Sequence, residues 1–147
     1  KELKMNTELD NYDLKAVRFL EDTKTHMQVE YISTGKYFVD DTEARDVYRI
    51  TLTNERGEHS FRFGDSLRNT QRPAASKRIP GAYDVLAGLY MPGEYTFDEF
   101  CQDAGYNNSP LSEYKKVLEM YTAVQVINRA LSNMFTPEQL CQLQDIN

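Results

Sequence analysis

The sequence predicts a single α+β domain over residues 1–147, in which an antiparallel sheet of four or five strands from the N-terminal half packs against about four helices from the C-terminal half. Between residues 14 and 63, apolar and aromatic residues alternate with polar ones, as in strands with one buried face. From residue 82 to residue 146, apolar residues recur every three or four positions, as in helices that cover a core. Because parallel neighbours need long crossovers between them, strands that precede all the helices indicate an antiparallel sheet.

The clearest strand pair is a hairpin. Residues 47–53 (VYRITLT) and residues 59–63 (HSFRF) both alternate, and residues 54–57 (NERG) lie between them as a turn. Gly57 can supply the positive φ angle that such a loop often needs. His59 shares a strand face with two phenylalanines, so we interpret it as a partly buried packing residue and not as a catalytic base.

The chain before the hairpin gives weaker strand signals. Residues 27–32 (MQVEYI) alternate, and residues 33–36 (STGK) are expected to turn the chain toward a further strand at residues 37–39. Residues 14–20 fit either a strand or a short helix, and we prefer the strand.

Two helix starts carry a capping box, in which a hydroxyl residue is followed three positions later by Glu or Gln. The box TFDE at 96–99 opens a helix predicted over residues 97–104, and the box TPEQ at 136–139 opens a last helix predicted over residues 137–145. In the second box the proline occupies the first helical position, where its missing N–H costs nothing.

Two further helices follow from periodicity. A first helix is expected over residues 82–91, and a helix of about 25 residues is expected to begin after Ser109. The expected buried stripe of the long helix consists of Tyr114, Val117, Leu118, Tyr121, Val124, Asn128 and Leu131. Ten tyrosines and seven phenylalanines in the chain predict a ring-rich layer between sheet and helices.

Residues 64–80 form a basic loop that departs from the rest of the chain. Four cations, Arg68, Arg72, Lys77 and Arg78, stand there against Asp65 alone, whereas the whole chain carries a net charge of −6. Long loops in compact domains are usually functional or disordered. A basic loop on an acidic body can bind phosphate or an acidic partner surface, and the same composition also suits a linker that stays in solution.

No residue pattern predicts catalysis, a metal or a cofactor, so the chain is not expected to be an enzyme. Neither His26 nor His59 has a second ligand at zinc-site spacing. Cys101 has no neighbouring base to make it a nucleophile. The acidic residues 40–46 could hold a cation, but they lack the glycine and the spacing of a calcium loop, and a solvated turn explains them as well.

Composition narrows the class of protein. The longest apolar run is far shorter than the roughly 20 residues of a membrane helix, so no membrane association is expected. A sequence pI near 4.9 argues against nucleic acid as the main ligand. Two cysteines without a CxxC spacing favour the cytoplasm. The first residues lack the layout of a secretion signal, although a chain that begins at Lys1 leaves room for one removed earlier.

Several short motifs agree in order and spacing with a known group of proteins. They are FRFGDS at 61–66, PGAYDVLA at 80–87, TFDEFC at 96–101 with GY at 105–106, and FTPEQL at 135–140. Together, over roughly residues 47–147, they resemble small, mostly uncharacterised proteins encoded by bacteriophages, prophages and other mobile elements. The resemblance implies an accessory gene product that binds a host or mobile-element protein. It implies no catalytic role for any residue.

Two functions stay open at this point. The preferred one is a non-enzymatic, acidic interaction protein that occupies a partner's surface, and an acidic face could inhibit a nucleic-acid-binding protein by mimicking its ligand. The alternative is a small-ligand or anion-binding protein whose site lies between the basic loop and the helices, at Arg68, Arg72, Lys77, Arg78, Tyr83, Asp84 and Tyr106. The oligomeric state does not follow from the sequence.

Overall fold

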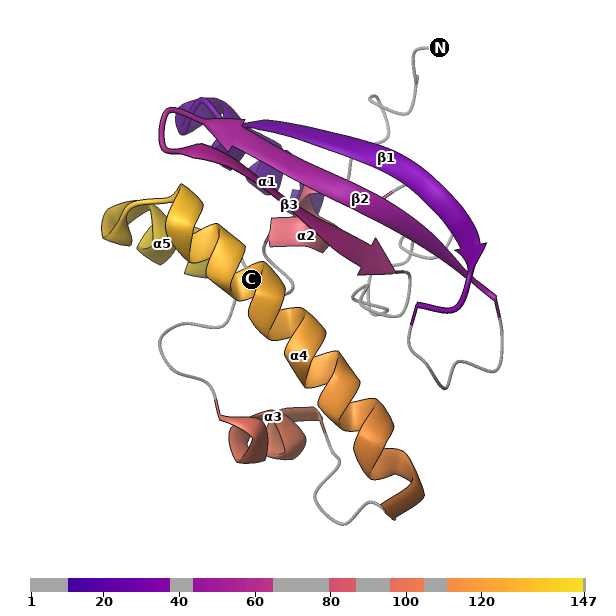
Figure 1. Cartoon of the computed structure of the whole chain (residues 1–147). Coiled ribbons are helices and arrows are strands. Elements are labelled where there is room, and N and C mark those ends of the chain that lie inside the picture. The colour runs from indigo at the N-terminus through magenta and orange to yellow at the C-terminus, as the bar shows by residue number, and fades with distance from the viewer. Residues whose placement is uncertain (1–10, 38–43, 65–79, 87–95, 105–110, 147) are drawn as a thin grey trace.

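The computed structural model describes residues 11–37, 44–64, 80–86, 96–104 and 111–146, and these form an α+β structure (Figure 1). The described part contains a three-stranded antiparallel sheet of order β1-β2-β3 and five helices. The elements are α1 (Asn11–Asp22), β1 (His26–Gly35), β2 (Arg45–Asn54), β3 (Gly57–Gly64), α2 (Ala82–Leu86), α3 (Phe97–Ala104), α4 (Leu111–Met134) and α5 (Pro137–Gln144).

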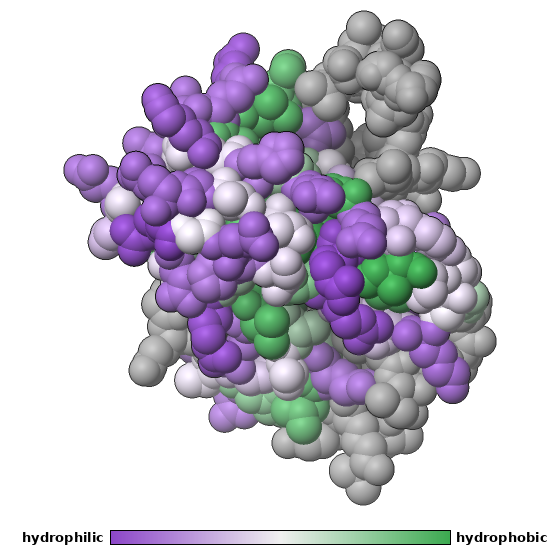
Figure 2. Space-filling model, turned by 45° about the horizontal axis from the view of Figure 1, so that its top comes forward, coloured by the Kyte–Doolittle hydropathy of each residue, from purple (hydrophilic) through white to green (hydrophobic). Residues whose placement is uncertain are grey.

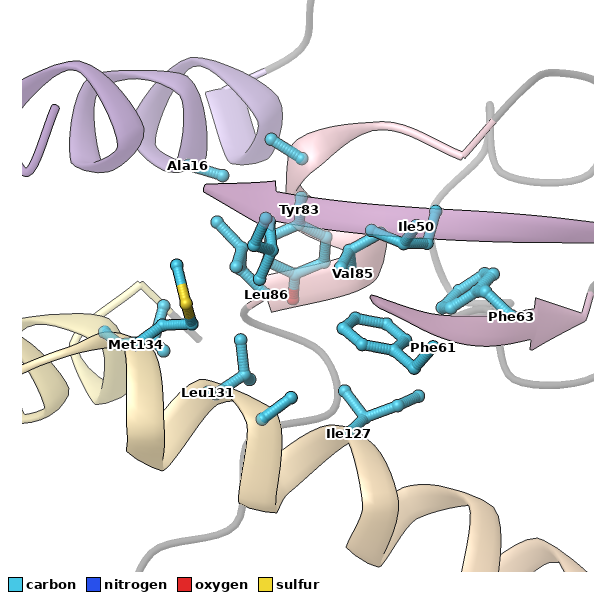
Figure 3. Packing of buried hydrophobic residues seen from close by; sticks show 14 of the residues in the cluster. Ala16, Ile50, Phe61, Phe63, Tyr83, Val85, Leu86, Ile127, Leu131 and Met134 are labelled. Atoms are coloured by element: carbon cyan, nitrogen blue, oxygen red, sulfur yellow. The ribbon is translucent and has the colours of Figure 1, made fainter. Parts of the chain in front are cut away.

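One hydrophobic cluster joins all five helices to the inner face of the sheet. Phe61 of β3 lies between the sheet and Ile127 of α4, and Ile50 of β2 lies beside Val85 of α2 (Figure 3). The buried rings also include Phe19 and Phe135, which meet edge to face with 4.9 Å between their centroids. Aromatic side chains therefore form much of the layer between sheet and helices, as the composition predicts.

The opposite face of the sheet is polar. Thr51 of β2 and Ser60 of β3, which are paired in the sheet register, share a hydrogen bond of 2.8 Å across that face. Arg49 and Arg62 are likewise paired and exposed. Hydrophilic residues also cover most of the molecular face shown in Figure 2, with smaller hydrophobic areas between them. The alternation seen in the sequence thus separates a buried face from a solvated one over most of the sheet. Val47, on the same face as Arg49 and Thr51, is buried at the end of the sheet where it pairs with the last residue of β3.

The predicted hairpin is confirmed. β2 and β3 pair antiparallel with Ile50 opposite Phe61 and with Asn54 opposite Gly57. Gly57 has a φ angle of +132°, so a glycine at this position avoids the strain that a side chain would introduce. His59 is partly buried opposite Leu52, in agreement with a packing role.

The sheet differs from the prediction at its N-terminal side. β1 contains the expected strand at residues 27–32 but continues to Gly35, so most of the turn expected over residues 33–36 is strand. A register shift between Tyr31 and Ser33 bends this strand, which lets it continue across the turn-like residues. Tyr37 lies in a bend after β1, while the rest of the strand expected at residues 37–39 lies outside the described residues.

The strand predicted over residues 14–20 is wrong, because these residues belong to α1. Ala16, Phe19 and Leu20 are buried at the i, i+3, i+4 spacing of one helix face. A fifth helix therefore replaces one of the four or five expected strands, and the helices are not confined to the C-terminal half.

α1 ends in a Schellman motif built around a lysine. Lys24 adopts a left-handed conformation with a φ angle of +54°. Its N–H donates to the carbonyl of Glu21 at 3.1 Å, and the N–H of Thr25 donates to the carbonyl of Leu20 at 2.9 Å. Glycine is the usual residue at this position, so the sequence carries no clear sign of the helix end.

The helix predictions hold where the chain is described. Both capping boxes are formed: the N–H of Glu99 donates to the Thr96 hydroxyl at 3.1 Å, and the N–H of Gln139 donates to the Thr136 hydroxyl at 3.2 Å. The reciprocal bonds from Thr96 N–H and Thr136 N–H are 2.9 Å each. α4 has 24 residues, close to the expected length. Residues 87–91 of the expected first helix lie outside the described residues.

Candidate functional site

The anion site expected from the sequence lies largely beyond what the structure describes. Arg68, Arg72, Lys77, Arg78 and Tyr106 fall outside the described residues, so their convergence stays a prediction. Tyr83 and Asp84 are described, on α2, and only 4% and 3% of them are exposed.

Asp84 and Asp13 have local structural roles beside α2. The Oδ2 atom of Asp84 accepts a 2.8 Å hydrogen bond from the N–H of Gly81, and the Oδ1 atom of Asp13 in α1 accepts one of 3.4 Å from the N–H of Tyr83. A Cβ atom added to Gly81 would lie 2.8 Å from Asp13 Oδ1, so the close approach of the two elements requires glycine. Asp13 therefore joins α1 to the start of α2, and Asp84 closes the first turn of α2 itself.

The described chain does form an open groove between α4 and the far end of the sheet. Its volume is about 570 Å³, within the range of small-molecule pockets. One wall is formed by Tyr37 and Arg62, and α4 forms the other. The α4 residues that line the groove are Leu118, Glu119, Thr122, Ala123 and Val126.

The sheet wall depends on a glycine, Gly64, which has no side chain. The ring of Tyr37 lies against Gly64 so closely that an added Cβ atom would come within 2.7 Å of the ring atom Cδ1. The phenol donates a hydrogen bond of 3.4 Å to the backbone carbonyl of Arg62, and the Arg62 guanidinium carbon lies 5.0 Å from the ring centroid. Gly64 and Arg62 thus hold the Tyr37 ring in place as part of the groove.

Burial raises the pKa of Tyr37 from its ordinary value of 10.0 to about 12, although the positive charge of Arg62 opposes the shift. Between pH 10 and about 12 the unfolded chain releases this proton while the folded chain retains it, so folding stability falls as the pH rises through that range. We expect Tyr37→Phe to lack this loss. Relative to its value at pH 9, the free energy of unfolding should then fall about 1 kcal/mol less in the variant than in the wild type by pH 11.

Urea unfolding of both proteins at pH 9 and pH 11 measures this difference. Any constant effect of losing the hydroxyl cancels between the two pH values. Equal pH dependence in the two proteins would contradict the burial of Tyr37 in the groove wall.

The α4 wall exposes apolar side chains. Leu118 and Val126 are 42% and 47% exposed, and Ala123 lies beside them. The hydroxyl of Thr122, between them, donates to the carbonyl of Leu118 at 2.9 Å. The Thr122 hydroxyl is therefore hydrogen-bonded within the helix, and α4 presents a mainly apolar surface to the groove.

The buried stripe predicted for the long helix includes Leu118, and this part of the prediction is wrong. Val117, Val124 and Leu131 of the predicted stripe are buried, but Leu118 lies in the groove. The available signal was a second stripe at four-residue spacing, Leu118, Thr122 and Val126, next to the core stripe. Periodicity alone does not tell which of two adjacent apolar stripes a sheet will cover.

Metal ligands, membrane-spanning helices and thiols are considered for the described residues. Among these residues, no group of three or more His, Cys, Asp or Glu residues could hold a metal ion. No helix in the same part of the chain has both the length and the apolar content that a membrane span requires. Cys101 and Cys141 are free thiols.

No family model matches the chain, and neither the curated proteins nor the solved structures contain a significant match to it.

Proposed function

We propose that the chain is a non-enzymatic binding protein that holds a partner protein in the groove between α4 and the Tyr37–Arg62 wall. The observation that carries this proposal is the exposure of two large apolar side chains, Leu118 and Val126, within one groove. Fully burying a side chain of this size contributes about 1.5–3 kcal/mol. Just under half of each side chain is exposed, so a partner that covers both would gain roughly half of that free energy from each. Clustered exposed apolar residues commonly mark interaction sites.

The net charge of −6 supports a partner with basic residues around the docking region. Opposite charges at the rim of an interface accelerate association and select the partner, and salt weakens them. Inhibition of a host nucleic-acid-binding protein by charge mimicry is the form of this function that suits an acidic protein best.

We also propose where this protein acts: in the cytoplasm of a bacterial host, as the product of a phage or another mobile element. The motif resemblance supports an origin in a phage or another mobile element, and with it a host or mobile-element protein as the partner. Two free thiols support a reducing compartment such as the cytoplasm. We therefore place the search for the partner in a bacterial host lysate.

Site-specific photocrosslinking tests the proposed function. A photoreactive amino acid at Val126 should give one dominant covalent adduct with a lysate protein, because this position lies in the groove. The same amino acid at Gln28, which is exposed on β1 and does not line the groove, is the control and should not give that adduct. The adducts are identified by mass spectrometry. Equal adducts at both positions, or none at Val126, would argue against a partner in the groove.

A further inference from the structure

We infer that the segment held in the groove is an amphipathic helix of the partner, with an acidic residue beside its apolar stripe that faces Arg62. This inference rests on the proposed function, because it names the partner segment for the same groove. Three features of the described walls support it: the spacing of the apolar residues, the scarcity of free hydrogen-bonding groups, and the charge of Arg62.

The apolar residues of α4 are spaced for another helix. Leu118 and Val126 are eight residues apart, which is about 12 Å along the helix axis. Ala123 lies between them and is small enough to leave room for a side chain from the partner. A second helix laid along this surface would place residues i, i+4 and i+7 against it, since ridges of one helix pack into the hollows of another.

Hydrogen-bond accounting favours a helix over an extended segment. An extended segment brings backbone N–H and C=O groups that must find partners, and a buried group without a partner is costly. The α4 wall offers few: its carbonyls serve the helix, the Thr122 hydroxyl donates to the Leu118 carbonyl, and Glu119, which also lines this wall, already has an interaction of its own. On the sheet wall, the Arg62 carbonyl accepts the Tyr37 phenol. A helix satisfies its own backbone and needs none of these groups.

Charge sets the chemistry of the occupant and its position. The exposed guanidinium of Arg62 lies on the sheet wall, 5.0 Å from the centroid of the Tyr37 ring. A carboxylate on the partner helix can form a charge-assisted hydrogen bond there, which strengthens as the groove closes over it. Glu119 on the α4 wall would repel such a carboxylate, so the acidic residue is expected on the flank that faces the sheet and not on the flank that faces α4. The basic residues of the partner lie outside the groove.

Two display libraries test this inference on the intact chain. One presents an 18-residue helix with apolar residues at i, i+4 and i+7 and random residues elsewhere, and the other presents extended segments with alternating apolar residues. A selected peptide is assigned to the groove when Val126→Glu lowers its affinity for the chain about tenfold or more and Leu14→Glu leaves that affinity unchanged. Leu14 is a matched control because it is 38% exposed on α1 and does not line the groove.

We expect groove binders from the helical library, enriched in Asp or Glu beside the apolar stripe. Repeating the selection on Arg62→Glu should replace that preference with Lys or Arg. Groove binders that are mainly extended, or an acidic preference that survives Arg62→Glu, would overturn the inference and leave the proposed docking function intact. If no binder from either library responds to Val126→Glu, both proposals fail.

Discussion

Replacing Asn54 with leucine should lower the free energy of unfolding by about 2–4 kcal/mol, because three hydrogen bonds end on this one side chain. Its Nδ2 group donates to the carbonyl of Met134 at 2.9 Å and to the hydroxyl of Thr25 at 3.0 Å. Its Oδ1 atom accepts from the N–H of Arg56 at 2.8 Å. Asn54 thus joins the β2–β3 turn to the last turn of α4 and to the segment after α1.

The loss would leave polar groups without partners in a partly buried place. The Met134 carbonyl belongs to the end of α4, where the helix itself supplies no donor. The nearby bond from Arg56 Nε to the Asn133 carbonyl, 3.2 Å long, depends on the same turn geometry. We therefore expect the substitution to loosen the contact between the hairpin and the helix and to cost more than one hydrogen bond.

Urea unfolding measures this change in the free energy of unfolding. Two further variants, a control and a second substitution of Asn54, test its cause. Thr53→Val changes the neighbouring residue, whose hydroxyl makes only an exposed bond of 3.4 Å to Glu58, and should stay within about 0.5 kcal/mol of the wild type. Asn54→Asp keeps the acceptor for Arg56 but turns a carboxylate oxygen toward the Met134 carbonyl, which can only accept, so it should be strongly destabilised as well. An Asn54→Leu variant as stable as the Thr53→Val variant would show that these bonds do not hold the turn.

Local signals account for what the sequence predicted well. The hairpin and both capping boxes depend on residues a few positions apart. Short motifs such as TFDE and TPEQ are therefore enough to predict the capping boxes. Asn54 is an example of a residue whose role such local signals predict only in part. Its place in a turn follows from the residue type, but its bond to Met134 joins positions 80 residues apart and becomes visible only once the fold is known.

The error at α1 has a different cause. The helix carries its apolar residues on one face, at Ala16, Phe19 and Leu20, but they also form adjacent pairs with neighbouring residues that suit a strand. A glycine at position 24 would have signalled a helix end, and the chain has a strained lysine there instead. The packing of Phe19 on Phe135 is a tertiary contact that decides the matter in favour of the helix.

The groove could not be predicted because it depends on the relative placement of two distant elements. Val117 and Leu118 are adjacent and both apolar, yet 3% of Val117 and 42% of Leu118 is exposed. Leu118 lines the groove, and the other wall of the groove includes the Tyr37 ring, which lies against Gly64 at the end of β3. Neither feature has a signature in the periodicity of the long helix.

Substituting Leu118 by glutamate should abolish most partner binding through the groove. A charged side chain in place of a covered leucine removes the apolar contact and adds a desolvation cost, and we expect affinity to fall by about 2 kcal/mol or more, as at the centre of other interfaces. The fold should be little affected, because 42% of Leu118 is exposed in the free chain and a glutamate there can turn its carboxylate into solvent. The added negative charge would, if anything, strengthen long-range attraction to a basic partner, so lost binding would point to the groove itself.

The most direct test of the docking groove compares Leu118→Glu with Leu14→Glu, which adds the same charge at a similarly exposed leucine on α1. Each immobilised chain is titrated with the purified partner identified by crosslinking at position 126, and the dissociation constants are measured at two salt concentrations. We predict wild-type affinity for Leu14→Glu and a loss of about thirtyfold or more for Leu118→Glu at both concentrations. Equal affinities for the two variants would contradict the claim that this protein holds its partner between α4 and the Tyr37–Arg62 wall.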